Sequence, residues 1–189
     1  MLWPAAIVLG FIVGLATGGS LENLGRLRLR FQSPWVVIAA VVVREAAVLT
    51  PLRNVEGVQY VYAATLAALV AWTVWHINRV MGIWLVAAGS ALNLVVIAAN
   101  GGRMPVASEL AGRLVQRGHI GQYIVMSSDT HLNWLADWIA LPGLSRWVPI
   151  EAYSPGDLIV ALGIASLIAI GMSKRGAAET QPRIVSDPP

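Results

Sequence analysis

Five apolar stretches of the chain are each about as long as a helix must be to cross a lipid bilayer, which takes about 20 mostly apolar residues. They are residues 2–18, 34–52, 59–77, 80–99 and 155–172. Backbone polar groups inside a bilayer must be satisfied within the segment itself, so each stretch is expected to be helical. The sequence therefore predicts an all-α integral membrane protein, with about five transmembrane helices in one domain over residues 1–175.

The composition agrees with a membrane protein. Hydrophobic residues make up 57% of the 189 positions and charged residues only 12%, whereas an ordinary soluble domain carries about 25% charged residues. There are no cysteines, which excludes disulfides, thiolate metal sites and cysteine nucleophiles. Basic residues are scattered instead of forming a stripe, so the expected partners are membrane lipids and other membrane protein subunits, and no nucleic acid.

The positions of the basic residues predict the orientation of the chain in a bacterial cytoplasmic (inner) membrane. Six basic residues fall on one side of the five predicted spans: Arg26, Arg28, Arg30, Arg79, Lys174 and Arg175. Only Arg53 lies in a short connection on the opposite side. Because basic residues accumulate on the cytoplasmic side, we expect an extracytoplasmic N-terminus and a cytoplasmic C-terminus. Residues 176–189 are then a disordered cytoplasmic tail, and the long connection 100–154 is extracytoplasmic.

Within this long outer connection, residues 129–141 are predicted to form a short amphipathic helix. Asp129, Asn133 and Asp137 share one face at helical spacing, and Ser127 or Ser128 can cap the first turn. The segment is too short to cross a bilayer, so we expect it to lie in the interface. Asp129 and His131 diverge on a helix, and no metal site is predicted.

Small residues mark two faces where helices can approach closely. Gly10, Gly14 and Gly18 recur every four residues in the first span, a spacing typical of helix packing in membranes. The partner is either another span of this chain or a different subunit. In the fourth span a second face contains Gly82, Gly89, Ser90 and Asn93, of which Asn93 can hydrogen-bond to a neighbouring helix.

Two charged residues, Arg44 and Glu45, fall inside the second apolar stretch. A charge there costs about 2.5–3.5 kcal/mol on insertion scales. Adjacent helical positions diverge by about 100°, so the two side chains are not expected to neutralise each other side by side. Either the span ends near Val43 and the pair lies at the outer interface, or the pair forms a polar site within the bundle.

Irregular segments border the outer connection. In "NGGRMPV", Gly101 and Gly102 allow the chain to leave the helix and Pro105 prevents the helix from resuming. In "YSPGDLI", Ser154 is a candidate N-cap, with a proline at the first helical position and Asp157 in the first turn. Arg103 and Asp157 should lie at similar depth, and we expect them to pair.

These motifs resemble an uncharacterised family of small multi-spanning bacterial membrane proteins, classed as a domain of unknown function. The resemblance covers most of residues 1–172, and Ala136 departs from it where a glycine is expected. The family offers no activity to carry over, and the resemblance implies a helical membrane fold whose outer motifs belong together. The matching residues are Asn100, Gly101, Gly102, Arg103, Met104, Pro105, Gly156 and Asp157.

The sequence favours a non-enzymatic accessory subunit or scaffold of a membrane complex, with no catalytic residue, metal or cofactor. The alternative is a protein that binds a lipid or small solute, either a transporter or a membrane enzyme. Its candidate site is a polar cluster under the outer connection that contains Arg44, Glu45, Asn93, Asn100, Arg103, Asp137 and Asp157.

Overall fold

The computed structural model describes residues 2–27, 31–116, 121–140 and 152–173, and the chain there is mostly helical. The predicted tail, residues 176–189, lies outside the described residues, as do Arg28, Arg30, Lys174 and Arg175. The helices are α1 (Leu2–Ala16), α2 (Leu21–Leu27), α3 (Trp35–Leu49), α4 (Val58–Trp75), α5 (Ile83–Ala99), α6 (Ser108–Gln116) and α7 (Pro155–Met172), with single 3₁₀ turns at η2 (Pro51–Asn54) and η3 (Asn133–Leu135).

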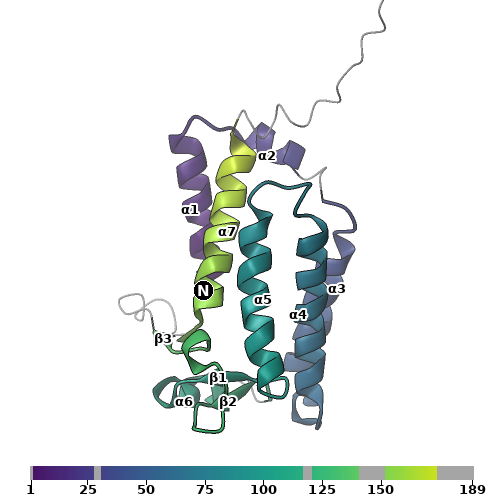
Figure 1. The fold of residues 1–189 in the computed structure, drawn as a ribbon. Coiled ribbons are helices and arrows are strands. Elements are labelled where there is room, and N and C mark those ends of the chain that lie inside the picture. Colours follow the sequence, from purple (N-terminus) through teal and green to yellow (C-terminus); the bar gives the residue numbers. More distant parts are fainter. Residues whose placement is uncertain (1, 28–30, 117–120, 141–151, 174–189) are drawn as a thin grey trace, which may run out of the picture.

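Five long helices stand next to one another in the order α1, α7, α5, α4, α3 (Figure 1). The last helix in the chain therefore lies between α1 and α5. Helix α2 and the connection from α4 to α5 lie at one end of the bundle, which we call the α2 end. A small β structure covers the opposite end, which we call the sheet end.

The sheet end is built from two pairs of short strands. β1 (Met104–Val106) pairs in parallel with β2 (Tyr123–Val125), and β3 (Ile139–Ala140) pairs antiparallel with β4 (Ala152–Tyr153). The backbone of Asp137 extends the first pair, because its N–H donates to the carbonyl of Pro105 and its carbonyl accepts from Ala107. The all-α prediction is thus incomplete: the fold is helical with a small β cap.

The predicted interfacial helix over residues 129–141 is not formed. Polar side chains of this segment bond to nearby groups instead: the Thr130 hydroxyl donates to the Ser127 carbonyl and the Asn133 side chain, and the Asp129 N–H donates to the Ser127 hydroxyl. Such local bonds compete with helical ones. Leu132 has a φ of +58°, and only the single turn η3 remains. Asp129 is exposed while Asp137 is buried, so the predicted polar face does not exist.

Glycines let α7 approach its two neighbours closely. A Cβ on Gly10 would lie 2.8 Å from the carbonyl oxygen of Ala165, and one on Gly14 would overlap the side chain of Met172. The glycine face of α1 therefore packs inside this chain, against α7. Gly18 does not belong to it, since it follows the end of α1 with a φ of +77° and has nothing within 4 Å of its Cβ position.

The start of α7 has the capping residues that the sequence predicts. Ser154 caps the helix by accepting a hydrogen bond from the Asp157 N–H, and Pro155 is the first helical residue. The Asp157 carboxylate accepts in return from the Ser154 N–H, which completes a capping box. The predicted N-cap and first turn are confirmed.

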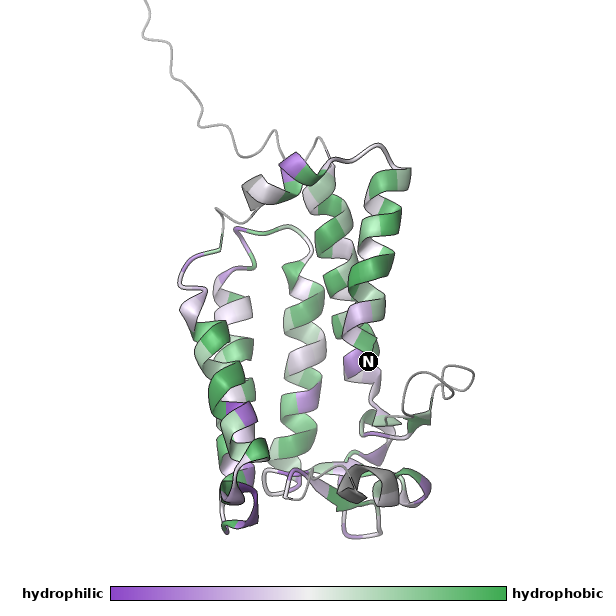
Figure 2. Cartoon of the chain, turned by 180° about the vertical axis from the view of Figure 1, so that it is seen from behind, coloured by the Kyte–Doolittle hydropathy of each residue, from purple (hydrophilic) through white to green (hydrophobic). Residues whose placement is uncertain are grey.

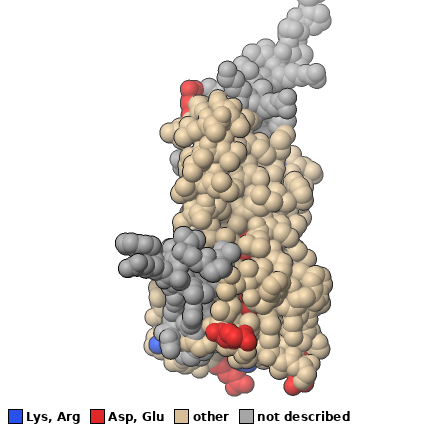
Figure 3. All heavy atoms as spheres, turned by 90° about the vertical axis from the view of Figure 1, so that its left-hand side faces the viewer, with Lys and Arg blue, Asp and Glu red and all other residues tan. Residues whose placement is uncertain are grey.

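Two of the helices, α4 and α7, are long and apolar enough to cross a membrane, while α1 and α5 are apolar but shorter. Much of the apolar surface faces outwards: Trp35 is 66% exposed and Leu49 77%. Figure 2 shows hydrophobic residues along much of each long helix, and Figure 3 shows one face with few charged side chains between the two ends. These features are compatible with a membrane protein.

Candidate functional site

A cavity of about 570 Å³ lies between α3, α4, α5 and α7, with the β cap over it. We call it the central cavity. Its walls along the helices are apolar and include Val37, Leu69 and Val86. Polar side chains come from four helices and from the cap: Arg44, Tyr62, Thr65, Ser90, Asn93, Asp157, Gln122 and Asp137.

On one side of the cavity, side chains of α5 and of the start of α7 form a hydrogen-bond network. The Asn93 amide donates to Asp157 Oδ1 at 2.9 Å and accepts from the Ser154 hydroxyl at 2.8 Å. A Cβ on Gly156 would overlap the Asn93 side chain and lie 2.8 Å from the Gly89 carbonyl oxygen. The two glycines therefore allow the close approach that these hydrogen bonds need, and the network holds Asp157 in place.

Asp137 faces the cavity from the cap and is almost fully buried, with 3% exposure. Burial, followed by the negative charge of Asp157, raises the pKa of Asp137 to about 8. Its Oδ1 has no hydrogen-bond partner within the described part of the chain. A carboxyl group in this state can donate a proton to an acceptor, or can bind a cation after losing the proton.

Arg44 lies near the C-terminal end of α3, which continues past Val43 to Leu49. Its guanidinium contacts Glu45 Oε1 at 3.2 Å and donates to Gln122 Oε1 at 3.3 Å. The expectation that these neighbours cannot pair side by side is wrong, because long side chains can bend back towards each other. Arg44 reaches the cavity, whereas Glu45 is not among its lining residues.

Three buried polar atoms without hydrogen-bond partners in the described chain belong to residues that line this one cavity. They are Tyr62 Oη, Gln122 Nε2 and Asp137 Oδ1, and each residue is less than 10% exposed. The fourth such atom, Arg103 Nε, belongs to a residue that does not line the cavity. Buried polar groups are nearly always bonded, so the clustering marks a place where a bound molecule could supply the partners. Sequence analysis did not find Tyr62 or Gln122, since neither lies in a recognisable motif.

Asn100 fastens the cap to the end of α5. Its side chain donates to the carbonyls of Val96 and His131, and accepts from the His131 N–H at 2.8 Å. The Asn100 side-chain amide thus forms two hydrogen bonds with the backbone of His131, one to its carbonyl and one from its N–H. Asn100 does not line the cavity, and its role in this fold is to hold the wall that does.

The rest of "NGGRMPV" turns the chain under the bundle. Gly101 and Gly102 have φ values of +65° and +87°, as predicted for an exit from the helix. A Cβ on Gly102 would lie 3.1 Å from the side chain of Gln59, so this residue also packs against the start of α4. Met104 and Pro105 follow as buried residues of β1, and Met104 lines the cavity.

The predicted pairing of Arg103 with Asp157 is not formed. Asp157 instead accepts from Asn93 and from the Ser154 backbone, so its carboxylate is bonded without Arg103. Within the described residues, Arg103 forms no ion pair or side-chain hydrogen bond. The sequence predicted that both residues lie at the same end of the bundle, but it could not show that Asn93, and not Arg103, would bond to Asp157.

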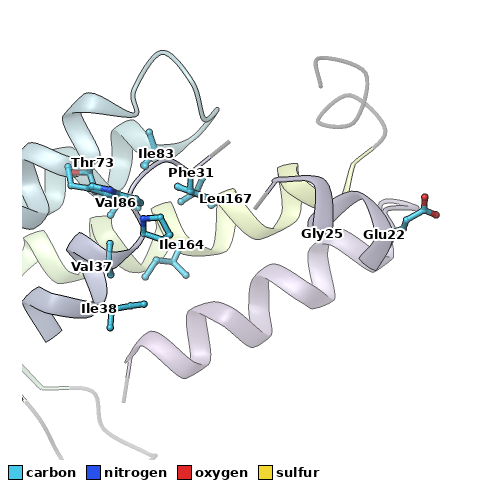
Figure 4. A pocket seen from close by; sticks show the side chains of 12 residues that line it. Glu22, Gly25, Phe31, Val37, Ile38, Thr73, Ile83, Val86, Ile164 and Leu167 are labelled. Carbon is cyan, nitrogen blue, oxygen red and sulfur yellow. The ribbon is translucent and has the colours of Figure 1, made fainter. Parts of the chain in front are cut away.

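A second, apolar hollow of about 1060 Å³ extends towards the α2 end, and we call it the apolar groove. Figure 4 shows its side chains, including Phe31, Ile83 and Leu167, between α3, α5 and α7. Residues that line both the groove and the central cavity are Val37, Trp72, Thr73, Val86 and Ile164. The two hollows are therefore adjacent, and most of the polar side chains lie at the sheet end, although Glu22 and Thr73 also line the groove.

The chain was compared with known proteins. A protein family described as a family of unknown function (DUF5317) matches residues 28–169. The chain belongs to this family. The match includes both outer motifs and the residues that line the central cavity from α3 to α7, and it begins after α1. No curated protein and no solved structure matches.

Proposed function

We propose that this member of the DUF5317 family binds an amphiphile of the membrane, with the polar group of the ligand at the sheet end of the central cavity and its apolar chain along the helices. The observation that carries the proposal is the gathering of three unpartnered buried polar atoms around one cavity. The site combines apolar walls with a few polar groups, as small-molecule sites generally do.

The shape of the site supports an amphiphile over a small polar solute. A polar solute would leave the apolar groove unfilled, whereas a hydrocarbon chain can continue past Trp72 and Ile164 from the cavity into the groove. Burial of each CH₂ group of such a chain contributes about 0.8 kcal/mol. The apolar groove therefore favours a ligand with a long chain.

The finer membrane arrangement is part of the proposal. We place α1, α3, α4, α5 and α7 across a bacterial cytoplasmic membrane, with the N-terminus and the sheet end outside and the C-terminus inside. The outward apolar surface of α1 and α3 supports this placement, and so does the excess of basic residues in the short connections, where Arg26, Arg28, Arg30 and Arg79 stand against Arg53. In this arrangement the ligand's polar group lies near the outer surface.

A scaffold or accessory subunit, which the sequence favours, would use the glycine faces to dock partner helices. Gly10, Gly14, Gly89 and Gly156 already contact helices of this chain. These faces therefore give no support to a docking role, and the cavity is the stronger basis for a function.

Native mass spectrometry of the protein purified in a mild detergent tests the proposal. We expect one amphiphile to remain bound to each wild-type chain. Ile164→Trp fills the boundary between cavity and groove and should remove it. Leu162→Trp is the matched control, because Leu162 lies on the same helix but is 57% exposed and lines neither hollow.

Retention of the amphiphile by folded Ile164→Trp protein would contradict the proposal, as would a wild-type protein that carries none and takes none up. Circular dichroism of both variants checks that the helices are intact. A protein subunit purified in stoichiometric amount, with no amphiphile, would support the scaffold instead.

A further inference from the structure

We infer that the polar group of this ligand is a cationic amine that carries an oxygen atom beside it. The inference rests on the proposed function, because it concerns the same cavity. It follows from the charges that line the cavity and from the hydrogen-bonding roles of its unpartnered atoms.

Acidic groups exceed basic groups around the cavity. Asp137 and Asp157 both line it, and Arg44 is the only Lys or Arg among the lining residues of the described chain. The guanidinium charge of Arg44 is shared between Glu45, at 3.2 Å, and Asp157, whose carboxylate it stabilises, so Asp137 has no cation of its own among the described lining residues. A buried carboxylate without a cation is costly, and a positively charged ligand group would reduce this cost.

The unpartnered atoms specify the groups next to that charge. Asp137 Oδ1 accepts hydrogen bonds when the carboxyl is ionised, and an ammonium N–H can supply one. Gln122 Nε2 can only donate, because the Gln122 carbonyl oxygen already accepts from Arg44, so it needs an oxygen on the ligand. Tyr62 Oη can serve either group. An amine with a neighbouring oxygen satisfies all three atoms.

An anionic group fits this arrangement poorly. Phosphate or carboxylate oxygens would accept from Gln122 and from protonated Asp137, but they would be repelled by the negative charge of Asp157 and by Asp137 once it is ionised. A neutral hydroxyl could bond to both Asp137 and Gln122 but would not compensate the acidic charge. The charge of the polar group therefore distinguishes cationic, neutral and anionic ligands at this site.

Proton linkage gives the inference a second, independent readout. Within the described chain, the charged or titratable groups that line the cavity with Asp137 are Arg44 from α3, Tyr62 from α4, Asp157 from α7 and Tyr123 from β2, and Asn93 from α5 and Gln122 before β2 also line it. The pKa of Asp137 is about 8, so below this pH most molecules hold a proton there. A cation binds the ionised form, so binding releases that proton and affinity should rise with pH up to about 8.

Calorimetric titration of the full chain in a mild detergent, freed of its bound amphiphile, tests the inference with four probes of equal chain length. They are N-dodecylethanolamine, dodecylammonium, dodecanol and dodecanoate. At pH 8 we expect N-dodecylethanolamine to bind at least about tenfold more tightly than dodecanol, with dodecanoate weakest, which is a difference of about 1.4 kcal/mol. Dodecylammonium, which lacks the oxygen, should be intermediate. From pH 6 to 8 the affinity for the amines should rise by up to about tenfold per unit.

Asp137→Asn should abolish both the preference for amines and the pH dependence. Asp129→Asn is the matched control, since Asp129 is an exposed carboxyl in the same segment, and it should bind as the wild type does. If Asp137→Asn fails to fold, the wild-type pH series decides: an affinity for amines that is flat or falling from pH 6 to 8 overturns the inference.

The outcomes separate this inference from the proposed function. Dodecanol or dodecanoate binding as tightly as the amines would overturn the cationic ligand while leaving an amphiphile site in place. If no probe of any charge binds and no amphiphile is purified with the protein, both the inference and the proposed function fail.

Discussion

Asp137 is a buried carboxyl group that the backbone around it holds at the edge of the central cavity. The backbone of Asp137 is fixed by hydrogen bonds to Pro105 and Ala107, so its carboxyl group cannot leave the interior without disrupting the β cap. The carboxyl is nevertheless left without a partner on Oδ1. A fold that keeps a costly group in place suggests a functional use for that group.

The first prediction concerns the stability of the ligand-free protein. The pKa of Asp137 in the folded state, about 8, exceeds its ordinary value of 3.8. The folded state therefore holds a proton that the unfolded state releases, and the stability of the wild type decreases as pH rises from about 4 to about 8, by at most about 1.4 kcal/mol per unit. Asp137→Asn cannot ionise, so its Tm should exceed that of the wild type by more at pH 8 than at pH 5.

Thermal unfolding followed by tryptophan fluorescence at several pH values measures this difference. Asp129→Asn provides the control, because Asp129 is exposed and its replacement should leave the pH dependence of the Tm unchanged. A constant Tm difference between wild type and Asp137→Asn over pH 5 to 8 would show that burial of this carboxyl has no energetic consequence.

Residues with local rules could be predicted from the sequence, and residues with distant partners could not. Ser154 and Asp157 form a capping box within four positions, and Gly101 and Gly102 adopt positive φ next to their helix. Asn93 needs a partner 64 positions away and Gln122 one 78 positions away. No spacing in a single sequence identifies such partners, so Asn93 was expected to bond to a neighbouring helix without its partner being known, and Gln122 was missed.

At the scale of elements, the apolar stretches predicted the helices well, and the polar outer connection was predicted poorly. Hydrophobic length determines where α4, α5 and α7 form, because buried or lipid-facing segments must satisfy their own backbone. The segment after Ser127 has a helical pattern of polar and apolar residues, yet its hydroxyl and amide side chains bond locally and Asp137 extends β1. Strand pairing between segments far apart in the sequence overrides a local pattern.

The second prediction tests the contact between α5 and α7. Gly156→Ala should be strongly destabilising, by about 1–3 kcal/mol, because the added methyl group would overlap Asn93 and approach the Gly89 carbonyl. It should also separate Asn93 from Asp157 and so weaken binding of the amphiphile. Thermal unfolding in detergent measures the loss.

Gly25→Ala serves as the control for this contact. Gly25 lies in α2 with nothing within 4 Å of its Cβ position, and alanine is the better helix former, so this variant should be as stable as the wild type or slightly more stable. Equal stability of Gly156→Ala and Gly25→Ala would show that α5 and α7 are not held as closely as the structure has them.

At the scale of the whole molecule, the open question is how many helices cross the membrane. Within the described residues, only α4 and α7 reach 18 residues, and α1 and α3 contain 15 each. At about 1.5 Å per residue the five helices are about 22 to 27 Å long, less than the 30 Å of a typical hydrocarbon core. Short helices can still span where the bilayer thins around them, at a modest cost.

The third prediction decides between five spans and two. The chain has no cysteine, so single cysteines at Glu56, Met81 and Ser108 can report their side of the membrane by reaction with an impermeant thiol reagent. All three positions are exposed in the connections that follow α3, α4 and α5. If all five long helices cross, Glu56→Cys and Ser108→Cys label from outside the cell, and Met81→Cys labels only after the membrane is opened. If only α4 and α7 cross, α5 does not separate Met81 from Ser108, and these two positions label together. That second pattern would contradict the proposed arrangement, in which four spanning helices, α3, α4, α5 and α7, surround the central cavity.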